Sequence, residues 1–291
     1  MFEKVLVPID FSDESDRVLT FTKGLKQFGL KEITLVHVVD IGHAVVYPLP
    51  AAISEAIEVR IEERRAELEL HGILTQSFIL EGNPSDEILK MTRDNDYSLI
   101  ITGSHGKRLL EEILLGSVSE AISRESKTPV LLIRYDILKD IEQVEPLDEY
   151  ATRTFRKVLF PSDFSRCSKE AMEVLKDLKK AGVKEVVGLH IVDTKRVETE
   201  TEKDEQLRAC KSETNKIMKE LNSAGFKVSS ICRVGDPLTE ILSVAEETNA
   251  TLILMGSHGK GVVREWLIGS VSLNVIRTAD RPALVIHEGE S

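Results

Sequence analysis

Short apolar runs alternate with longer amphipathic stretches along the first half of the chain. Val5–Ile9 shows no polar alternation, which is typical of a strand buried on both faces of a sheet. Ser12 or Asp13 then caps a predicted helix that runs toward Phe28. The same alternation predicts further strands over Glu32–Val39, Ile73–Leu80, Ser98–Thr102 and Pro129–Ile133, and further helices over Ala52–His71, Pro84–Asp94 and Glu111–Arg124.

The second half of the chain repeats the first at a constant offset. Residues 4–12 recur as residues 157–165, which gives an offset of 157 − 4 = 153. Residues 103–107 recur as residues 256–260 at the same offset. A period of this length is too long for a solenoid repeat and suits a whole domain.

The repeat predicts two tandem domains, over residues 1–135 and 156–291, with a linker over residues 136–155. The linker is acid-rich, contains Pro146 and lacks a clean hydrophobic period, so we expect an exposed connection. In each domain, strands alternating with helices predict a doubly wound, five-stranded parallel sheet of the α/β class. Ligands of such sheets bind beyond the carboxyl ends of the strands, where the strand order reverses.

Composition and charge narrow the classes of function. The net charge of -11 argues against a general nucleic-acid or anionic-membrane binder, since both need a dense positive face. No apolar run approaches the roughly 20 residues that span a bilayer, and the N-terminus shows no signal peptide. The three cysteines, Cys167, Cys210 and Cys232, include no C-x-x-C pair, so we expect buried or incidental thiols in a reducing cytoplasm.

A glycine-rich loop follows the fourth predicted strand of each copy. Its spacing is Gly103, two residues, Gly106, nine residues, Gly116 and Ser117, and the second copy repeats it. Glycine lets an anion approach the backbone, and the amides of such a loop and of the next helix N-terminus attract phosphate. A tight turn without a ligand is the alternative. The spacing differs from a P-loop and from a dinucleotide-binding turn.

This loop, together with an aspartate after the first strand, resembles the ATP-binding branch of the universal stress protein family, twice and over nearly the whole chain. The resemblance implies Rossmann-like, adenine nucleotide alpha hydrolase-like domains that form an internal pseudo-dimer through their fifth strands, with two chains able to dimerise further. It also implies that ATP or AMP binds, with Mg²⁺ accompanying the nucleotide. The residues implied to bind the nucleotide are Pro8, Asp10, Val38, Gly103, Gly106, Gly116, Ser117 and Val118, and then Pro161, Asp163, Ile191, Gly256, Gly259, Gly269, Ser270 and Val271.

The resemblance also implies a role for each kind of residue. The aspartates, Asp10 and Asp163, lie by the nucleoside, and Asp10 or Asp163 could also hold Mg²⁺. Val38 and Ile191 contact adenine, largely through their backbone. The glycines and the serine after the last glycine hold the phosphates.

Other polar residues near these motifs admit a second interpretation. His105 and His258 lie inside the loop and could act as general bases, but no carboxylate–histidine–nucleophile set is visible in the sequence. His37 and His190 lack a second metal ligand at fixed spacing, so we expect them to pack at strand ends. Lys107 and Lys260 either contact terminal phosphates or are solvated.

Three functions remain open from the sequence. The first is a nucleotide-responsive binding protein, without catalytic residues. The second is a slow ATPase or nucleotidyl-transfer enzyme of the same architecture, because phosphoryl transfer depends mainly on positioning and charge. The third is a structural or assembly protein in which the loop is a relic.

Overall fold

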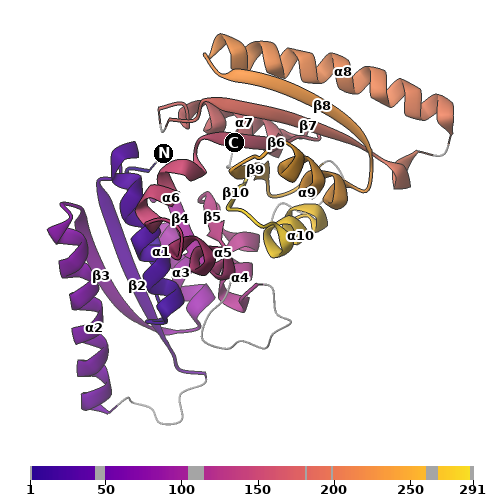
Figure 1. The fold of residues 1–291 in the computed structure, drawn as a ribbon. Helices are drawn as coiled ribbons and strands as arrows, with labels where there is room; N and C mark the ends of the chain where they lie inside the picture. The colour runs from indigo at the N-terminus through magenta and orange to yellow at the C-terminus, as the bar shows by residue number, and fades with distance from the viewer. Residues whose placement is uncertain are drawn as a thin grey trace. The chain divides into compact units, whose positions relative to one another are not determined.

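The computed structural model describes residues 2–42, 50–103, 115–180, 182–197, 199–259 and 268–288 (Figure 1). The chain divides into two compact units, Met1–Thr152 and Arg153–Ser291, which we call the first and second domains. Gly106, His105, Lys107 and Lys260 lie outside the described residues.

The first domain is a parallel α/β domain, as the alternation of apolar runs predicts. Its strand order is β3-β2-β1-β4-β5, and each of these neighbouring strands pairs in parallel with the next. Helix α3 packs on α4, and α1 packs on α5. Its elements are β1 (Lys4–Pro8), α1 (Asp13–Lys23), η1 (Gly24–Phe28), β2 (Glu32–Asp40), α2 (Ala51–Leu70), β3 (Leu74–Gly82), α3 (Pro84–Asp94), β4 (Leu99–Gly103), α4 (Ser117–Glu125), β5 (Val130–Ile133), α5 (Tyr135–Glu142) and α6 (Leu147–Thr154).

The second domain repeats this architecture, with strand order β10-β9-β6-β7-β8. In both domains the order reverses beside the first strand, so the predicted doubly wound fold is confirmed. Its elements are β6 (Lys157–Pro161), α7 (Arg166–Asp177), β7 (Glu185–Asp193), η2 (Thr194–Arg196), α8 (Glu200–Ser223), β8 (Lys227–Gly235), α9 (Pro237–Glu247), β9 (Leu252–Gly256), α10 (Ser270–Thr278) and β10 (Ala283–Ile286).

The central strands form the core of each sheet. β4 and β9 are buried along their whole length, and β1 and β6 are buried at their three middle residues. Both faces of these strands are covered, which explains why their sequences lack polar alternation. The outer strands β3 and β8 are largely exposed or half-buried, so they tolerate polar residues.

The segment that connects the domains differs from the exposed, irregular linker expected from its sequence. It forms helices α5 and α6, and it buries Leu138, Leu147, Tyr150 and Ala151. Helix α6 lies so close to the start of η1 that a Cβ atom added to Gly24 would be 2.3 Å from a carbonyl oxygen of α6. Each helix has eight residues, just over two turns, and has an apolar face, but the sequence does not show which surface covers that face.

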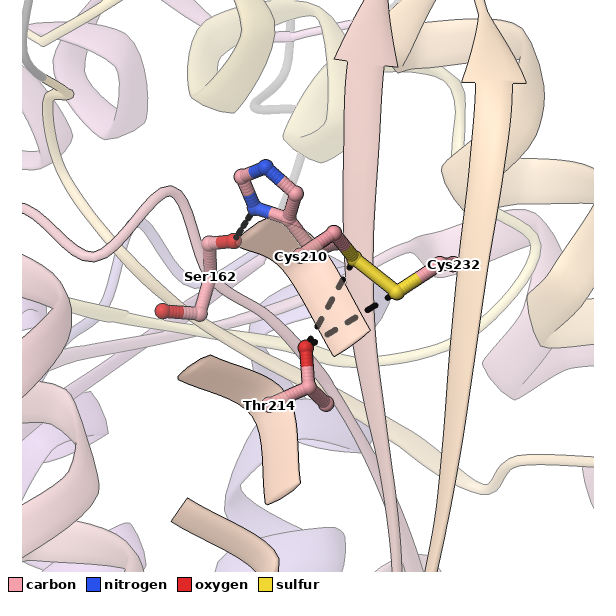
Figure 2. Close-up of a disulfide and its surroundings, with 5 residues drawn as sticks. Ser162, Cys210, Thr214 and Cys232 are labelled. Atoms are coloured by element: carbon pink, nitrogen blue, oxygen red, sulfur yellow. Dashed lines mark hydrogen bonds between the residues drawn. A yellow bond between two sulfur atoms is a disulfide. The ribbon is translucent and has the colours of Figure 1, made fainter. Parts of the chain in front are cut away.

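The cysteines of the second domain also overturn an expectation. Cys210 of α8 and Cys232 of β8 form a disulfide, which Figure 2 shows beside Thr214. The pair has no C-x-x-C spacing because the two residues meet only when α8 packs on β8. The expectation of three unpaired thiols is therefore wrong for Cys210 and Cys232. Cys167 is a buried free thiol, and burial raises its pKa.

Candidate functional site

A cavity of about 310 Å³ lies at the carboxyl end of the second sheet. It is bounded by residues at the ends of β6, β7 and β9 and at the start of α10, which is where doubly wound sheets bind ligands. All eight residues predicted for the second copy line this one cavity, namely Pro161, Asp163, Ile191, Gly256, Gly259, Gly269, Ser270 and Val271. Sequence segments more than 100 residues apart thus meet at a single concave surface.

The cavity wall also contains residues that the sequence did not single out. Met255, Pro237 and Ile241 supply apolar surface, and Asp193 supplies a carboxylate. No motif marks these positions, because their place on the wall follows from the packing of α9 and from the ends of β7 and β9. Ile191 lies inside β7, two residues before its end, as Val38 lies inside β2 of the first domain.

The two predicted aspartates are held by the same local turn. Oδ1 of Asp163 accepts hydrogen bonds from the backbone amide of Ser165 at 3.1 Å and from Oγ of Ser168 at 2.8 Å. Oδ1 of Asp10 accepts from the amide and the hydroxyl of Ser12, at 3.0 and 2.5 Å. These bonds fix the direction of both carboxylates.

The residue after each aspartate has an unusual backbone conformation. Phe11 and Phe164 have φ values of 60° and 62°, a left-handed region that large side chains rarely adopt. Each ring lies against a histidine, with centroids 4.4 Å apart in both domains. A strained backbone conformation of this kind persists only where the surrounding contacts hold it in place, and such residues are common at binding sites.

His37 and His190 pack at the ends of the second strands. Nδ1 of His37 donates to the carbonyl of Ile9 at 2.9 Å, and Nδ1 of His190 donates to the carbonyl of Ser162 at 2.6 Å. The carbonyl acceptor places the proton on Nδ1 in both rings. His190 also lines the cavity of the second domain.

The loop glycines are needed for contacts within the protein. A Cβ atom on Gly103 would lie 2.3 Å from the ring of Tyr135, and one on Gly256 would lie 2.8 Å from the sulfur of Cys167. A Cβ atom on Gly259 would lie 2.3 Å from Oδ2 of Asp163. The second loop glycine therefore lets the aspartate and the loop share one wall of the cavity.

Tyr135 lies near negative charge in the first domain. Burial raises its pKa well above the ordinary value, and the charges of Asp10 and Glu14 raise it further. The phenol therefore stays protonated at neutral pH. The position equivalent to Tyr135 is 135 + 153 = 288, which is Glu288, so the two sites differ here.

The start of the helix after each loop is suited to an anion. Gly116 caps α4 and Gly269 caps α10, and neither offers a side chain to the first-turn amides. These amides and the positive end of the helix dipole attract a phosphate group. Ser119 and Ser272 in the same first turns donate to the carbonyls of the first loop glycines, at 2.6 and 2.9 Å, which fixes each helix to its loop.

A carboxylate–histidine pair that the sequence did not reveal lies at the loop of the second domain. Nε2 of His258 is 3.2 Å from Oε2 of Glu288, and Nδ1 is 3.0 Å from Oγ of Ser257. Arg166 pairs with the same carboxylate at 2.8 Å. Ser257 is 1% exposed and does not line the cavity, so this set is not an accessible nucleophile with its base. The pair escaped sequence analysis because 30 residues separate its members.

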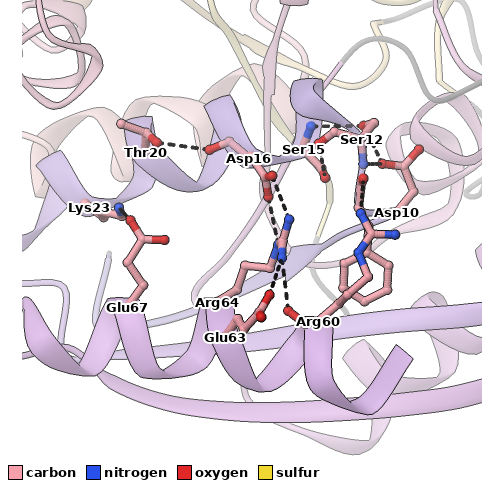
Figure 3. Close-up of polar contacts among 11 residues, drawn as sticks. Asp10, Ser12, Ser15, Asp16, Thr20, Lys23, Arg60, Glu63, Arg64 and Glu67 are labelled. Carbon is pink, nitrogen blue, oxygen red and sulfur yellow. Dashed lines mark hydrogen bonds and ion pairs between the residues drawn. The ribbon is translucent and has the colours of Figure 1, made fainter. Parts of the chain in front are cut away.

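Arginines of α2 lie beside the site of the first domain, as Figure 3 shows. Arg60 donates to the carbonyl of Phe11 at 2.9 Å and stacks over its ring. Arg64 forms two hydrogen bonds with Asp16 of α1, at 3.0 and 2.8 Å. These contacts fix the outer helix next to the residue that follows Asp10.

Among the described residues, no group of three or more histidine, cysteine, aspartate or glutamate side chains is arranged to hold a metal ion. Within the same part of the chain, no helix is both long and apolar enough to cross a membrane.

Comparisons with known proteins give one consistent result. The model of the universal stress protein family matches residues 1–134 and again residues 154–287. The chain is 34% identical to universal stress protein MJ0577 of Methanocaldococcus jannaschii over 158 residues, which is 47% of this chain and 98% of that protein. It is 25% identical to a universal stress protein of Mycolicibacterium smegmatis over 97% of this chain and 96% of the relative. The crystal structure of a universal stress protein from Archaeoglobus fulgidus aligns with a TM-score of 0.76 and 29% identity, over 99% of this chain and 100% of that one.

Proposed function

The chain belongs to the universal stress protein family, and we propose that it is a cytoplasmic, nucleotide-responsive regulatory protein that binds ATP or AMP in both domains. One observation carries the proposal: the residues predicted from the second copy of the motif all line one cavity. The volume of about 310 Å³ falls within the usual range for small-molecule sites.

The chemistry of the cavity supports an adenine nucleotide. The amides at the start of α10 suit the phosphates, and the fixed carboxylate of Asp163 suits the ribose hydroxyls or a nucleotide-bound Mg²⁺. Ile191, Met255 and Ile241 offer apolar surface for a flat base. Bound nucleotide then favours whichever conformation or assembly binds it more tightly. Pairing of the two domains as a pseudo-dimer, and dimerisation of chains, remain predictions.

Calorimetric titration with ATP, ADP and AMP, each with Mg²⁺, tests the proposal. We expect two sites, with Asp10→Ala weakening one and Asp163→Ala the other, by about 10-fold or more for a lost charged hydrogen bond. Asp177→Ala is the control, because Asp177 lies on the surface of α7 and does not line the cavity. These variants are preferable to valine at Gly103 or Gly256, which would clash with Tyr135 or Cys167. Absence of binding to protein shown to be nucleotide-free would refute the function.

Slow hydrolysis of ATP is the second candidate, and the His258–Glu288 pair favours it because His258 lines the cavity. A phosphate-release assay on the same samples decides between the two. We expect negligible turnover, since both ring nitrogens of His258 already contact protein groups. Turnover that disappears in His258→Asn, with ATP affinity retained, would establish the enzyme instead.

A further inference from the structure

Helix α2 packs on the outer strand β3 in the first domain, and helix α8 packs on the outer strand β8 in the second. Different side chains occupy the equivalent positions of these two contacts. In the first domain, Ile57 and Ile61 of α2 and Ile79 of β3 occupy the positions that correspond, at the offset of 153, to Cys210, Thr214 and Cys232. Three aliphatic side chains in one domain are thus replaced by a disulfide and a threonine in the other. Aliphatic side chains do not react with reductants, whereas a disulfide does, so only the second domain can respond to a reductant at these positions.

The second domain also lacks the arginine contacts of the first. The positions equivalent to Arg60 and Arg64 are Glu213 and Ile217, so neither position supplies a guanidinium. The buried residues of α8 are Cys210, Thr214, Met218 and Leu221. Residues 200–209 are exposed or half-buried, so Cys210 is the first buried side chain of the helix. The disulfide is therefore the covalent attachment of the N-terminal half of α8.

The disulfide lies next to the cavity along the sheet. Cys232 pairs with His190 in the register of β7 and β8, and Arg233 pairs with Ile191. His190 and Ile191 both line the cavity, and Figure 2 shows the disulfide together with Ser162, whose carbonyl accepts the hydrogen bond of His190. The chain leaves β7 at Asp193, which also lines the cavity, and reaches α8 within seven residues (200 − 193 = 7). The disulfide between α8 and β8 thus restrains the cavity residues of β7 in two ways: through the pairing of β8 with His190 and Ile191, and through the short connection from Asp193 to α8.

We propose that Cys210 and Cys232 form a redox-sensitive latch that controls ligand binding in the second domain and leaves the first domain unaffected. The inference rests on the proposed nucleotide site, since the latch acts on that cavity. Disulfides in a reducing cytoplasm are usually transient and redox-sensing, so a pair of this kind beside a binding site fits a switch. Because Ile57 and Ile79 stand at the equivalent positions, the first domain cannot form this disulfide and serves as an internal control.

The opening step is thiol–disulfide exchange with a dithiol reductant. A reductant thiolate attacks Sγ of Cys232, which is half-buried on the outer strand β8, and the sulfur–sulfur bond breaks. The bonding electron pair leaves on Sγ of Cys210, which takes up a proton, and the hydroxyl of Thr214 lies 3.7 Å from that sulfur. The second thiolate of the reductant then displaces Cys232. Two cysteine thiols and one oxidised dithiol result, so two electrons and two protons are transferred.

Two measurements on the full-length chain test the latch. The first is titration with ATP and Mg²⁺ of oxidised protein, of protein reduced with a small dithiol, and of Cys210→Ile/Cys232→Ile, which copies the first domain. Asp10→Ala is present throughout, so that binding in the second domain is observed alone. The second is amide hydrogen exchange over residues 190–210, which needs no nucleotide.

Reduction of the disulfide is expected to weaken ATP binding in the second domain by about fivefold or more. A factor of about five is the lower end of the range of affinity changes between coupled sites. It should also speed exchange over residues 190–210, while exchange over the corresponding residues 37–57 of the first domain is unchanged. The double isoleucine variant should bind equally under both conditions. Equal affinity and equal exchange in the oxidised and reduced protein would overturn the latch. Failure to bind ATP in either state refutes the nucleotide function, and the exchange comparison then still decides whether the latch exists.

Discussion

The contact between Gly259 and Asp163 gives the sharpest test of the site. A Cβ atom on Gly259 would lie 2.3 Å from Oδ2 of Asp163, whereas an ordinary contact begins at 3.4 Å. Gly259→Ala therefore requires the two groups to move apart by about 1 Å, which is the difference between these distances (3.4 − 2.3 = 1.1). The φ angle of Gly259 is not in the left-handed region, so alanine brings no backbone strain of its own.

The displacement translates into a measurable loss. Asp163 is fixed through its other oxygen by bonds of 3.1 and 2.8 Å from Ser165 and Ser168, and a shift of this size breaks at least one of them. A hydrogen bond to a charged group contributes about 1.5–3 kcal/mol. If the ligand requires the fixed carboxylate, its affinity for the second domain should fall roughly 10- to 150-fold, at 1.4 kcal/mol per factor of ten.

Asp177→Ala is the control for Gly259→Ala, because Asp177 lies on the surface of α7 and does not line the cavity. Titration with ATP and Mg²⁺, in an Asp10→Ala background, should show the loss for Gly259→Ala and near-native affinity for Asp177→Ala. Urea unfolding should show both variants folded. Native affinity in Gly259→Ala, or an equal loss in the control, would show that the position of Asp163 does not govern binding.

Two further predictions concern stability. Gly24→Ala should destabilise the first domain by about 1–3 kcal/mol in urea unfolding, because the new methyl group collides with α6; a gain of about 0.4–1 kcal/mol, as for an unhindered glycine, would show that α6 does not pack there. Asp236 caps α9, and the backbone amide of Thr239 holds its pKa below the ordinary value. The stabilisation of α9 by ionised Asp236 is therefore fully present above the pKa of this carboxyl in the unfolded chain. It is lost below about pH 4, as the pH falls through the lower pKa of the folded state. Asp236→Asn, which copies the cap Asn83 of α3, should remove this pH dependence from the amide exchange of the first turn of α9; an unchanged pH profile would contradict it.

The sequence by itself determined the repeat, the fold class and eight of the residues that line one cavity. Buried parallel strands are covered on both faces, so each appears as a continuous apolar run, and one constant offset then relates both copies. The residues after such strands meet at one end of the sheet, which is why eight positions taken from the motif line one cavity.

Only the tertiary structure decided which distant residues meet. Cys210 and Cys232 become neighbours through the packing of α8 on β8, and His258 and Glu288 through the ends of β9 and β10. Local periodicity reports which face of an element is buried, but it does not report the partner that covers it. For the same reason the burial of α5 and α6 was not predicted: each short helix has an apolar face, but the sequence does not show what covers it.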